Sequence, residues 1–214
     1  MIQGRRPLRS RETRWATKLT RGLLKVGFRP NQISILSVVF AVGGSVSLFL
    51  VPHFPNLSPL LWILGAAGIQ LRLLCNLMDG LLAVEGGLRT PDGDLYNEFP
   101  DRLSDPLLLV ALGWAGGEET TRLLGWLCGT GALLTAAIRL HGASLTGSHD
   151  FRGPMAKPQR MAVATVSCLV MAALAVFHLH LPVLTWILGI LFAGVVVTVI
   201  RRLSALSRAL RASD

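Results

Sequence analysis

Four oxygen-bearing side chains stand at the ends of two apolar runs, within the thirty residues from Asn76 to Asp105. Asn76 and Asp79 are three residues apart, and Asp101 and Asp105 are four apart, so each pair shares one face of a helix. Carboxylates near the end of a membrane-embedded helix are costly, and three that converge would repel one another without a counter-ion. Because every donor atom is oxygen, the set favours a hard divalent cation such as Mg²⁺, Mn²⁺ or Ca²⁺.

The same carboxylates have a simpler interpretation, which stays open at this point. They could lie in water at the helix ends, or they could pair with Arg72 and Arg102. The rule that charges inside membranes are rare and functional favours the metal site over this alternative.

The composition is typical of a membrane protein. Hydrophobic residues make up 51% of the chain and charged residues 15%, whereas a soluble domain carries about 25% charged residues. The net charge of +9 does not indicate nucleic-acid binding, because nine of the 21 basic residues lie in the first 29 positions and most others in short loops. That distribution is typical of anchoring to anionic lipid. The three cysteines lie singly in apolar runs and predict neither a disulfide nor a zinc site.

Apolar runs long enough to cross a bilayer predict an all-α protein with six transmembrane helices. The predicted spans are residues 32–51, 59–82, 101–115, 123–145, 161–177 and 183–200. A polar connection at residues 85–100 separates the second span from the third. Ahead of the spans, residues 11–26 place apolar and basic side chains at helical spacing, which predicts an amphipathic helix on the membrane surface. A solvated basic arm is the alternative for this segment.

The chain is expected to form one membrane domain with two short flanking segments. These are a basic arm with the interfacial helix (1–30), the transmembrane domain (31–202) and a basic C-terminal tail (203–214). With six spans, 17 of the 21 basic residues fall on the side of both termini, and Arg122 alone falls on the other. The positive-inside rule then places both termini and the acidic site on the cytoplasmic side of the cell membrane.

The residues around the acids resemble the signature of the CDP-alcohol phosphotransferases. That signature reads Asp-x-x-Asp-Gly-x-x-Ala-Arg, a spacer, and then Gly-x-x-x-Asp-x-x-x-Asp. The corresponding positions of this chain are Asn76, Asp79, Gly80, Ala83, Asp101 and Asp105. The family consists of integral membrane enzymes with six helices and a cytoplasm-facing site. They transfer a substituted phosphate from a CDP-linked donor to an alcohol and release CMP.

Three signature positions differ in this chain: Asn76 replaces the first Asp, Val84 the Arg, and Asn97 the second Gly. An asparagine carbonyl oxygen can still bind a hard cation, but it brings no charge, so metal binding should be weaker. The lost arginine removes a partner for phosphate, which another nearby arginine would have to replace.

The resemblance implies a role for each residue of the site. The ligands of Mg²⁺ or Mn²⁺ would be Asn76, Asp79, Asp101 and Asp105, and Asp105 would also be the general base for the acceptor hydroxyl. The residues that contact the CDP-linked donor would be Asn76, Gly80, Ala83 and Asn97. Apart from the resemblance, basic residues that could bind the acceptor's phosphate or a lipid headgroup are Arg139, Arg152, Lys157 and Arg160. Simpler roles remain open: small residues also serve helix packing, and basic loop residues also serve positive-inside anchoring.

The expected function is transfer of a phosphatidyl group from a CDP-linked lipid, with CDP-diacylglycerol favoured, to an alcohol in phospholipid synthesis. The expected partners are membrane lipids and these two substrates, without nucleic acid, and a homodimer is a family expectation. One alternative is a catalytically impaired relative that binds lipid or a partner, because Asn76 and Val84 depart from the signature. Another is a cation-coupled transporter, although such proteins bind ions near the bilayer midplane and not at the helix ends. The acceptor alcohol stays open.

Overall fold

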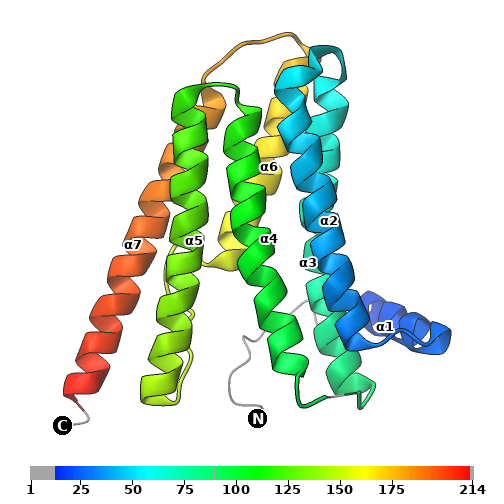
Figure 1. Cartoon of the computed structure of the whole chain (residues 1–214), viewed down its shortest axis with the longest axis vertical. Coiled ribbons are helices and arrows are strands. Elements are labelled where there is room, and N and C mark those ends of the chain that lie inside the picture. The colour runs from blue at the N-terminus through cyan, green and yellow to red at the C-terminus, as the bar shows by residue number, and fades with distance from the viewer. Residues whose placement is uncertain (1–12, 89, 213–214) are drawn as a thin grey trace.

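The computed structural model describes residues 13–88 and 90–212, which form an upright bundle of long helices with one short helix across its lower end (Figure 1). The predicted all-α class is confirmed. The α-helices are α1 (Arg14–Val26), α2 (Pro30–Leu50), α3 (Ser58–Glu85), α4 (Gly93–Ala115), α5 (Glu119–Thr146), α6 (Lys157–Val176) and α7 (Val183–Arg211). Two short 3-10 helices, η2 (Val51–His53) and η3 (Pro55–Leu57), connect α2 to α3.

In the described part of the chain, five segments are long and apolar enough to cross a membrane, where the sequence predicts six. They are Pro30–His53, Pro55–Val84, Glu119–Thr146, Lys157–Val176 and Val183–Arg211. Helix α4 is not among them because its first half carries several charged residues. It nevertheless stands beside the other long helices (Figure 1). The chain is therefore a multi-pass membrane protein in which the acid-bearing helix is the least apolar of the bundle.

Helix α4 begins eight residues earlier than the predicted third span. The connection predicted at residues 85–100 is therefore confined to residues 86–92. Pro100 and Pro106 lie inside α4, where each lacks the amide hydrogen that a helix interior normally uses. Neighbouring helices in a membrane bundle can compensate for such a loss. At the other end of the chain, α7 continues unbroken to Arg211 through most of the predicted basic tail.

The six long helices form a ring whose order differs from the chain order. Helix α2 packs against both α3 and α4, α4 against α5, α5 against α7, and α3 against α6. Helices α3 and α4 contact each other only sparsely, as do α4 and α6. The facing sides of α3, α4 and α6 therefore meet across the interior through side chains, with their backbones apart.

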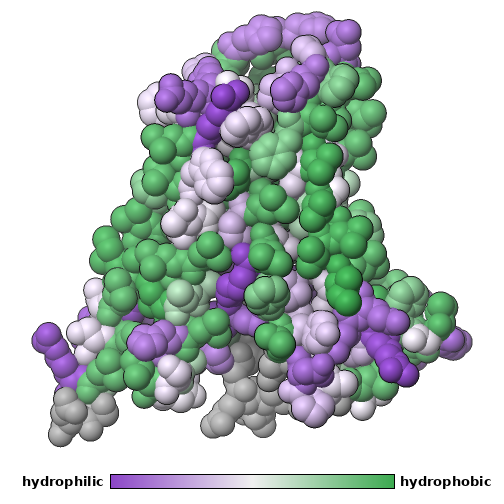
Figure 2. All heavy atoms as spheres, in the orientation of Figure 1, coloured by the Kyte–Doolittle hydropathy of each residue, from purple (hydrophilic) through white to green (hydrophobic). Residues whose placement is uncertain are grey.

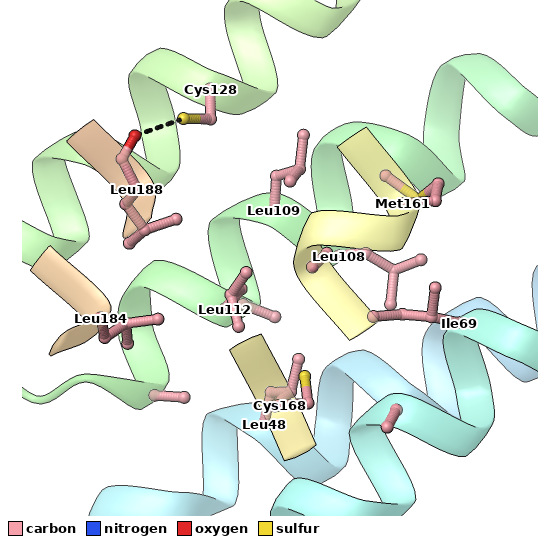
Figure 3. Packing of buried hydrophobic residues seen from close by; sticks show 14 of the residues in the cluster. Leu48, Ile69, Leu108, Leu109, Leu112, Cys128, Met161, Cys168, Leu184 and Leu188 are labelled. Atoms are coloured by element: carbon pink, nitrogen blue, oxygen red, sulfur yellow. Dashed lines mark hydrogen bonds between the residues drawn. The ribbon is translucent and has the colours of Figure 1, made fainter. Parts of the chain in front are cut away.

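The hydrophobic core fills the interior with side chains from most of the ring. Ile69 of α3, Leu108 and Leu112 of α4, Met161 of α6 and Leu188 of α7 are all fully buried (Figure 3). The Cys128 thiol donates a hydrogen bond to the Leu188 carbonyl oxygen at 3.7 Å. All three cysteines are buried and unpaired.

Two glycine contacts bring helices together in the half of the bundle that holds the α2–α3 and α4–α5 connections. A Cβ atom at Gly68 of α3 would lie 2.6 Å from the Cα atom of Gly44 on α2. A Cβ atom at Gly113 of α4 would lie 2.7 Å from the Cα atom of Gly125 on α5. Lipid tails are as apolar as leucine, so close packing of small residues is a main source of helix association in membranes. The bundle is narrower at one end and widens toward the end that carries both described ends of the chain (Figure 2).

Helix α1 lies across the wide end and packs against α3. Its buried residues are Ala16 and Thr20, and Leu24 packs against the same cluster as Met78 and Leu82 of α3. Trp15 on the outer side is 50% exposed. A helix is therefore present over residues 14–26, within the segment predicted to be amphipathic, while its amphipathic role on a membrane surface stays a prediction. Residues 1–12 of the predicted basic arm lie outside the described residues.

Candidate functional site

The predicted acids lie on the facing helices α3 and α4, and basic residues of α3 and α6 lie among them. Asp79 and Asp105 are each only 4% exposed, although both are charged side chains. Separately, Figure 2 shows one face of the molecule on which a polar patch lies between apolar flanks in the wider half of the bundle. The site is thus a buried polar cluster inside a membrane protein, and such clusters are usually functional.

Arg72 links the two acids of α4. Its guanidinium is fully buried, and Nη2 lies 2.6 Å from Oδ1 of Asp101 and 2.5 Å from Oδ1 of Asp105. Arg72 precedes Asn76 by four residues, so both side chains project from the same face of α3. Its Nε and Nη1 atoms have no hydrogen-bond partner among the described residues. The simpler interpretation of the sequence, in which Arg72 pairs with the carboxylates, therefore holds for these two acids.

Both oxygens of Asp101 are engaged by other side chains. The Asn76 amide donates a hydrogen bond from Nδ2 to Oδ1 at 2.6 Å. The Lys157 ammonium, at the first residue of α6, pairs with Oδ2. The side chain of Asp101 is 14% exposed, and that of Lys157 is 29% exposed. Asn76 and Asp101, which the sequence places 25 residues apart, are therefore in direct contact across the interior.

Asp105 lies deeper and is held by a second arginine. Arg160 Nη2 lies 3.3 Å from Oδ2 of Asp105. Arg160 Nη1 donates to Thr135 Oγ1 at 3.1 Å and to the Met155 carbonyl oxygen at 2.8 Å. These contacts fix Arg160 in one position. A buried carboxylate between two guanidinium groups avoids the large cost of an unpaired buried charge.

Asp79 has a different environment from the acids of α4. The Ser34 hydroxyl of α2 donates a hydrogen bond to its Oδ2 at 2.8 Å. Its Oδ1 is buried and has no hydrogen-bond partner in the described structure. An orphaned buried carboxylate oxygen is rare and calls for an explanation, of which an ion is one.

The donor chemistry of the site fits a hard divalent cation, but the acids are not gathered around a common point. No three His, Cys, Asp or Glu side chains among the described residues approach closely enough to hold a metal ion. The oxygen donors and the unpartnered Asp79 oxygen suit Mg²⁺ or Mn²⁺. The chain's own cations pair with Asp101 and Asp105, so the burial of these carboxylates leaves neither charge unpaired.

A second polar cluster surrounds Arg139 of α5. Glu98 forms ion pairs with both Arg139 and Arg102. The Arg139 guanidinium lies over the Phe151 ring, 5.5 Å from its centroid, and 3.5 Å from Nδ1 of His149. Burial, and then the charge of Arg139, lowers the pKa of His149. The loop beside Arg139 forms an open pocket of about 410 Å³, which is lined by Ser148, His149, Asp150, Phe151 and Arg152.

The structure separates the basic residues that the sequence grouped as one acceptor set. Arg139 lies in the second cluster, and Arg152 is exposed in the loop, where it pairs with Asp150. Lys157 and Arg160 belong to the first turn of α6 and contact the acids. No spacing in the sequence signals these last two contacts, because the partners are more than fifty residues apart.

The remaining predicted residues are placed only in part. On α3, Gly80 is buried and Ala83 is partly buried. Val84, at the position of the signature arginine, is 42% exposed. The side chain of Asn97 lies outside the described residues, so its predicted contact with the donor stays a prediction.

This fold and site define a multi-pass helical membrane protein with acids and fixed bases inside the wide end of its bundle. No protein-family model matches the chain. In sequence it is similar to phosphatidylinositol phosphate synthase from Mycobacterium tuberculosis, with 31% identity over 101 residues. That alignment covers 47% of this chain and 43% of the relative, less than half of the relative's length. The enzyme of the same name from Mycobacteroides abscessus is 25% identical over 205 residues, which cover 92% of this chain and 87% of the relative.

Solved structures of the Mycobacterium tuberculosis protein share the fold. The structure with CDP-DAG bound has a TM-score of 0.74 and 24% identity, covering 91% of this chain and 94% of that one. The complex with manganese and citrate has a TM-score of 0.73 and 23% identity, covering 89% and 88%. Together, these comparisons show that the chain shares the fold of the phosphatidylinositol phosphate synthase and is similar in sequence to proteins of that name.

Proposed function

We propose that the chain is a CDP-alcohol phosphotransferase that moves a phosphatidyl group from CDP-diacylglycerol to an alcohol and releases CMP. The observation that carries this proposal is the meeting of α3 and α4 at Asn76 and Asp101, where the signature places its acids. The similarity to phosphatidylinositol phosphate synthases over 92% of the chain supports it. The binding of CDP-DAG by a protein of the same fold supports the choice of donor.

In this proposal, the ligands of Mg²⁺ or Mn²⁺ are Asn76, Asp79, Asp101 and Asp105. When bound, the metal neutralises charge on the pyrophosphate as CMP departs. The unpartnered Oδ1 of Asp79 supports the assignment, as does the manganese complex of the protein of similar fold. The donor is bound by Asn76, Gly80, Ala83 and Asn97, and the small residues of α3 leave room for a nucleotide beside the helix.

The acceptor hydroxyl oxygen forms a bond to the phosphorus of the phosphatidyl group, and the bond from that phosphorus to the CMP oxygen breaks. When the last two acids of the signature are aligned with Asp101 and Asp105, the hydroxyl proton passes to the Asp105 carboxylate. Both oxygens of Asp105 face guanidinium groups, those of Arg72 and Arg160. One of these two guanidinium groups must move away before an oxygen of Asp105 can reach the acceptor hydroxyl.

The same signature also fits one helical turn earlier on α4, and the geometry favours that placement. Gly93, Asn97 and Asp101 then match Gly-x-x-x-Asp-x-x-x-Asp, with Asn97 in place of an acid. Asp101 contacts Asn76 and is 14% exposed, whereas the side chain of Asp105 is 6% exposed. In this second placement Asp101 takes the proton, and Asp105 is a structural partner of the arginines.

The acceptor is bound by basic residues near the wide end: Arg139, Arg152, Lys157 and Arg160. Arg139 supports this most directly, because it borders the loop pocket and offers a planar donor fork. A phosphate on the acceptor or on a lipid headgroup would suit such a fork.

In this proposal, the wide end of the bundle faces the cytoplasm. The chain crosses the membrane six times, with α4 as one of the spans, and α1 lies on the inner membrane surface. Both described ends of the chain lie at that end of the bundle (Figure 1). The excess of basic residues on the same side supports the orientation. The proposal also includes a division of the chain into a transmembrane domain with flanking segments at residues 1–30 and 203–214. It further includes assembly as a homodimer.

CMP release tests the proposed function. The purified chain in nanodiscs, supplied with CDP-diacylglycerol and Mn²⁺ or Mg²⁺, should release CMP when a suitable alcohol is present. A panel of inositol phosphate, glycerol phosphate, inositol and serine would identify the acceptor. Binding of the donor without CMP release for any acceptor would favour the impaired relative. Cation transport without donor binding would favour the transporter.

A further inference from the structure

The charges of the acid cluster balance without any metal. Asp79, Asp101 and Asp105 contribute three negative charges, and the bases that contact or adjoin them contribute three positive charges: Arg72, Lys157 and Arg160. A divalent cation that entered this neutral cluster would gain little net attraction, because the resident cations already offset the charge of each carboxylate at short range. One of the resident cations must therefore move if a metal is to bind.

Arg72 and Arg160 are poorly suited to move. Arg72 is fully buried and contacts two acids at once. Arg160 is 3% exposed and is tied to Thr135 and to the Met155 carbonyl as well as to Asp105. Displacing either guanidinium would leave a buried charge or a buried acid unpaired, which is strongly unfavourable.

Lys157 differs from both arginines in ways that allow it to leave. Its side chain is 29% exposed, whereas that of Arg72 is 0% and that of Arg160 is 4% exposed. Among the described residues, its ion-pair partner is Oδ2 of Asp101, the most accessible of the three acids. It stands at the first residue of α6, which begins partway along the bundle (Figure 1). A lysine side chain is a flexible stem with a single compact charge, unlike the planar fork of arginine.

We propose that Lys157 is a resident competitor for the divalent cation, holding Asp101 when the site contains no metal and leaving it when metal binds. This inference rests on the proposed function in one respect, that the site takes a divalent metal at all. It assigns to Lys157 control over metal affinity, a role separate from contact with the acceptor. Because one carboxylate of the signature is already an amide at Asn76, the competition leaves the resting site with little net attraction for a divalent ion.

Mn²⁺ binding to the full-length chain in nanodiscs, followed by electron paramagnetic resonance of the free ion, tests this inference without any substrate. Lys157→Met keeps the length of the stem and removes the ammonium. It should tighten Mn²⁺ binding about 10-fold, the equivalent of one partly buried ion pair. Lys18→Met is the matched control, because Lys18 is exposed on α1 at the same end of the bundle. It should shift the affinity less than about 2-fold, as expected of a distant and screened charge.

A double-mutant cycle separates direct competition from a general effect of charge. In an Asp101→Asn background, which has no carboxylate to release, Lys157→Met should tighten Mn²⁺ binding much less than in the wild type. Equal effects in both backgrounds would overturn the inference. Unchanged or weaker binding in Lys157→Met would overturn it too, provided that Lys157→Gln agrees and circular dichroism shows intact helices. If neither the wild type nor any variant binds Mn²⁺, both the inference and the metal part of the proposed function are overturned. If the wild type binds Mn²⁺ and Lys157→Met binds it with the same affinity, only the inference is overturned.

Discussion

Asp105 is the residue whose role separates the two placements of the signature on α4. If Asp105 is the base, Asp105→Asn should lower turnover by about 10²–10⁴-fold, the usual range for loss of a general base. Donor affinity should change much less, because Asp79 and Asp101 remain. CMP release and donor binding across a metal titration would measure both effects.

A purely structural role for Asp105 predicts a different result for the same variant. Asp105→Asn would then leave Arg72 and Arg160 with less counter-charge, and loss of one partner of a buried pair costs about 3–5 kcal/mol of stability. Thermal unfolding in detergent would record this loss. Turnover that stays near normal in the folded fraction would exclude Asp105 as the base and leave Asp101, the acid of the other placement, as the candidate.

The metal proposal predicts the effects of single substitutions on α3 and α4. Asp79→Ala and Asp101→Ala should each abolish CMP release, because each removes an oxygen ligand from a site already short of one carboxylate at Asn76. Asn76→Asp should retain activity and tighten metal binding. Chelator-dependent loss of turnover checks the requirement, with Asp92→Ala in the exposed turn before α4 as the control. Turnover that survives a chelator would refute the metal requirement.

The acids could be predicted from the sequence because a single helix turn encodes their spacing. The partners that neutralise them could be predicted only in part. Of the two arginines that the sequence offers as partners, Arg72 pairs with the acids of α4, whereas Arg102 pairs with Glu98. The contact of Lys157 with Asp101 and that of Ser34 with Asp79 join different helices. Such contacts depend on the order of helices around the ring, which hydrophobic periodicity does not determine.

The extent of α4 shows a similar limit at the scale of elements. Asp94, Glu98 and Pro100 are unfavourable in an apolar span, so the sequence places the start of the helix at Asp101. In the structure, Glu98 lies within α4 and forms ion pairs with Arg102 and Arg139. Polar residues that pair inside the protein can therefore belong to a membrane helix that a hydropathy pattern ends too early.

The contact between α2 and α3 predicts a contrast between two identical substitutions. Gly68→Ala should destabilise the bundle by about 1–3 kcal/mol, because the new Cβ atom would meet the backbone of α2. The nearest atoms are Gly44 Cα at 2.6 Å and Phe40 O at 2.8 Å, neither of which is a flexible side-chain end. Gly43→Ala, with nothing within 4 Å of its new Cβ atom, should be neutral or slightly stabilising. Thermal unfolding of both variants in one detergent is the measurement, and equal melting temperatures would contradict the close approach.

For the whole molecule, the charge distribution predicts that both termini lie in the cytoplasm. Reporter fusions at the N-terminus and the C-terminus should both show cytoplasmic activity, and a reporter inserted between α4 and α5, beside Arg122, should not. An external signal from either terminus would contradict the six-span arrangement and the cytoplasmic site together. The sequence predicts this topology through charge counts alone, and the structure adds that both described ends lie at the same end of the bundle (Figure 1).

The glycine contacts between α2 and α3 and between α4 and α5 draw the helices together at one end only, and the other end is broadened further by α1 (Figure 2). A tapered body of this kind occupies unequal areas in the two leaflets of a bilayer, whichever way it is inserted. Lipids in the leaflet at the wide end must make room for more protein than those opposite. The chain therefore alters the balance of area between the leaflets simply by being present, and in small vesicles the sign of the curvature will favour one of its two orientations.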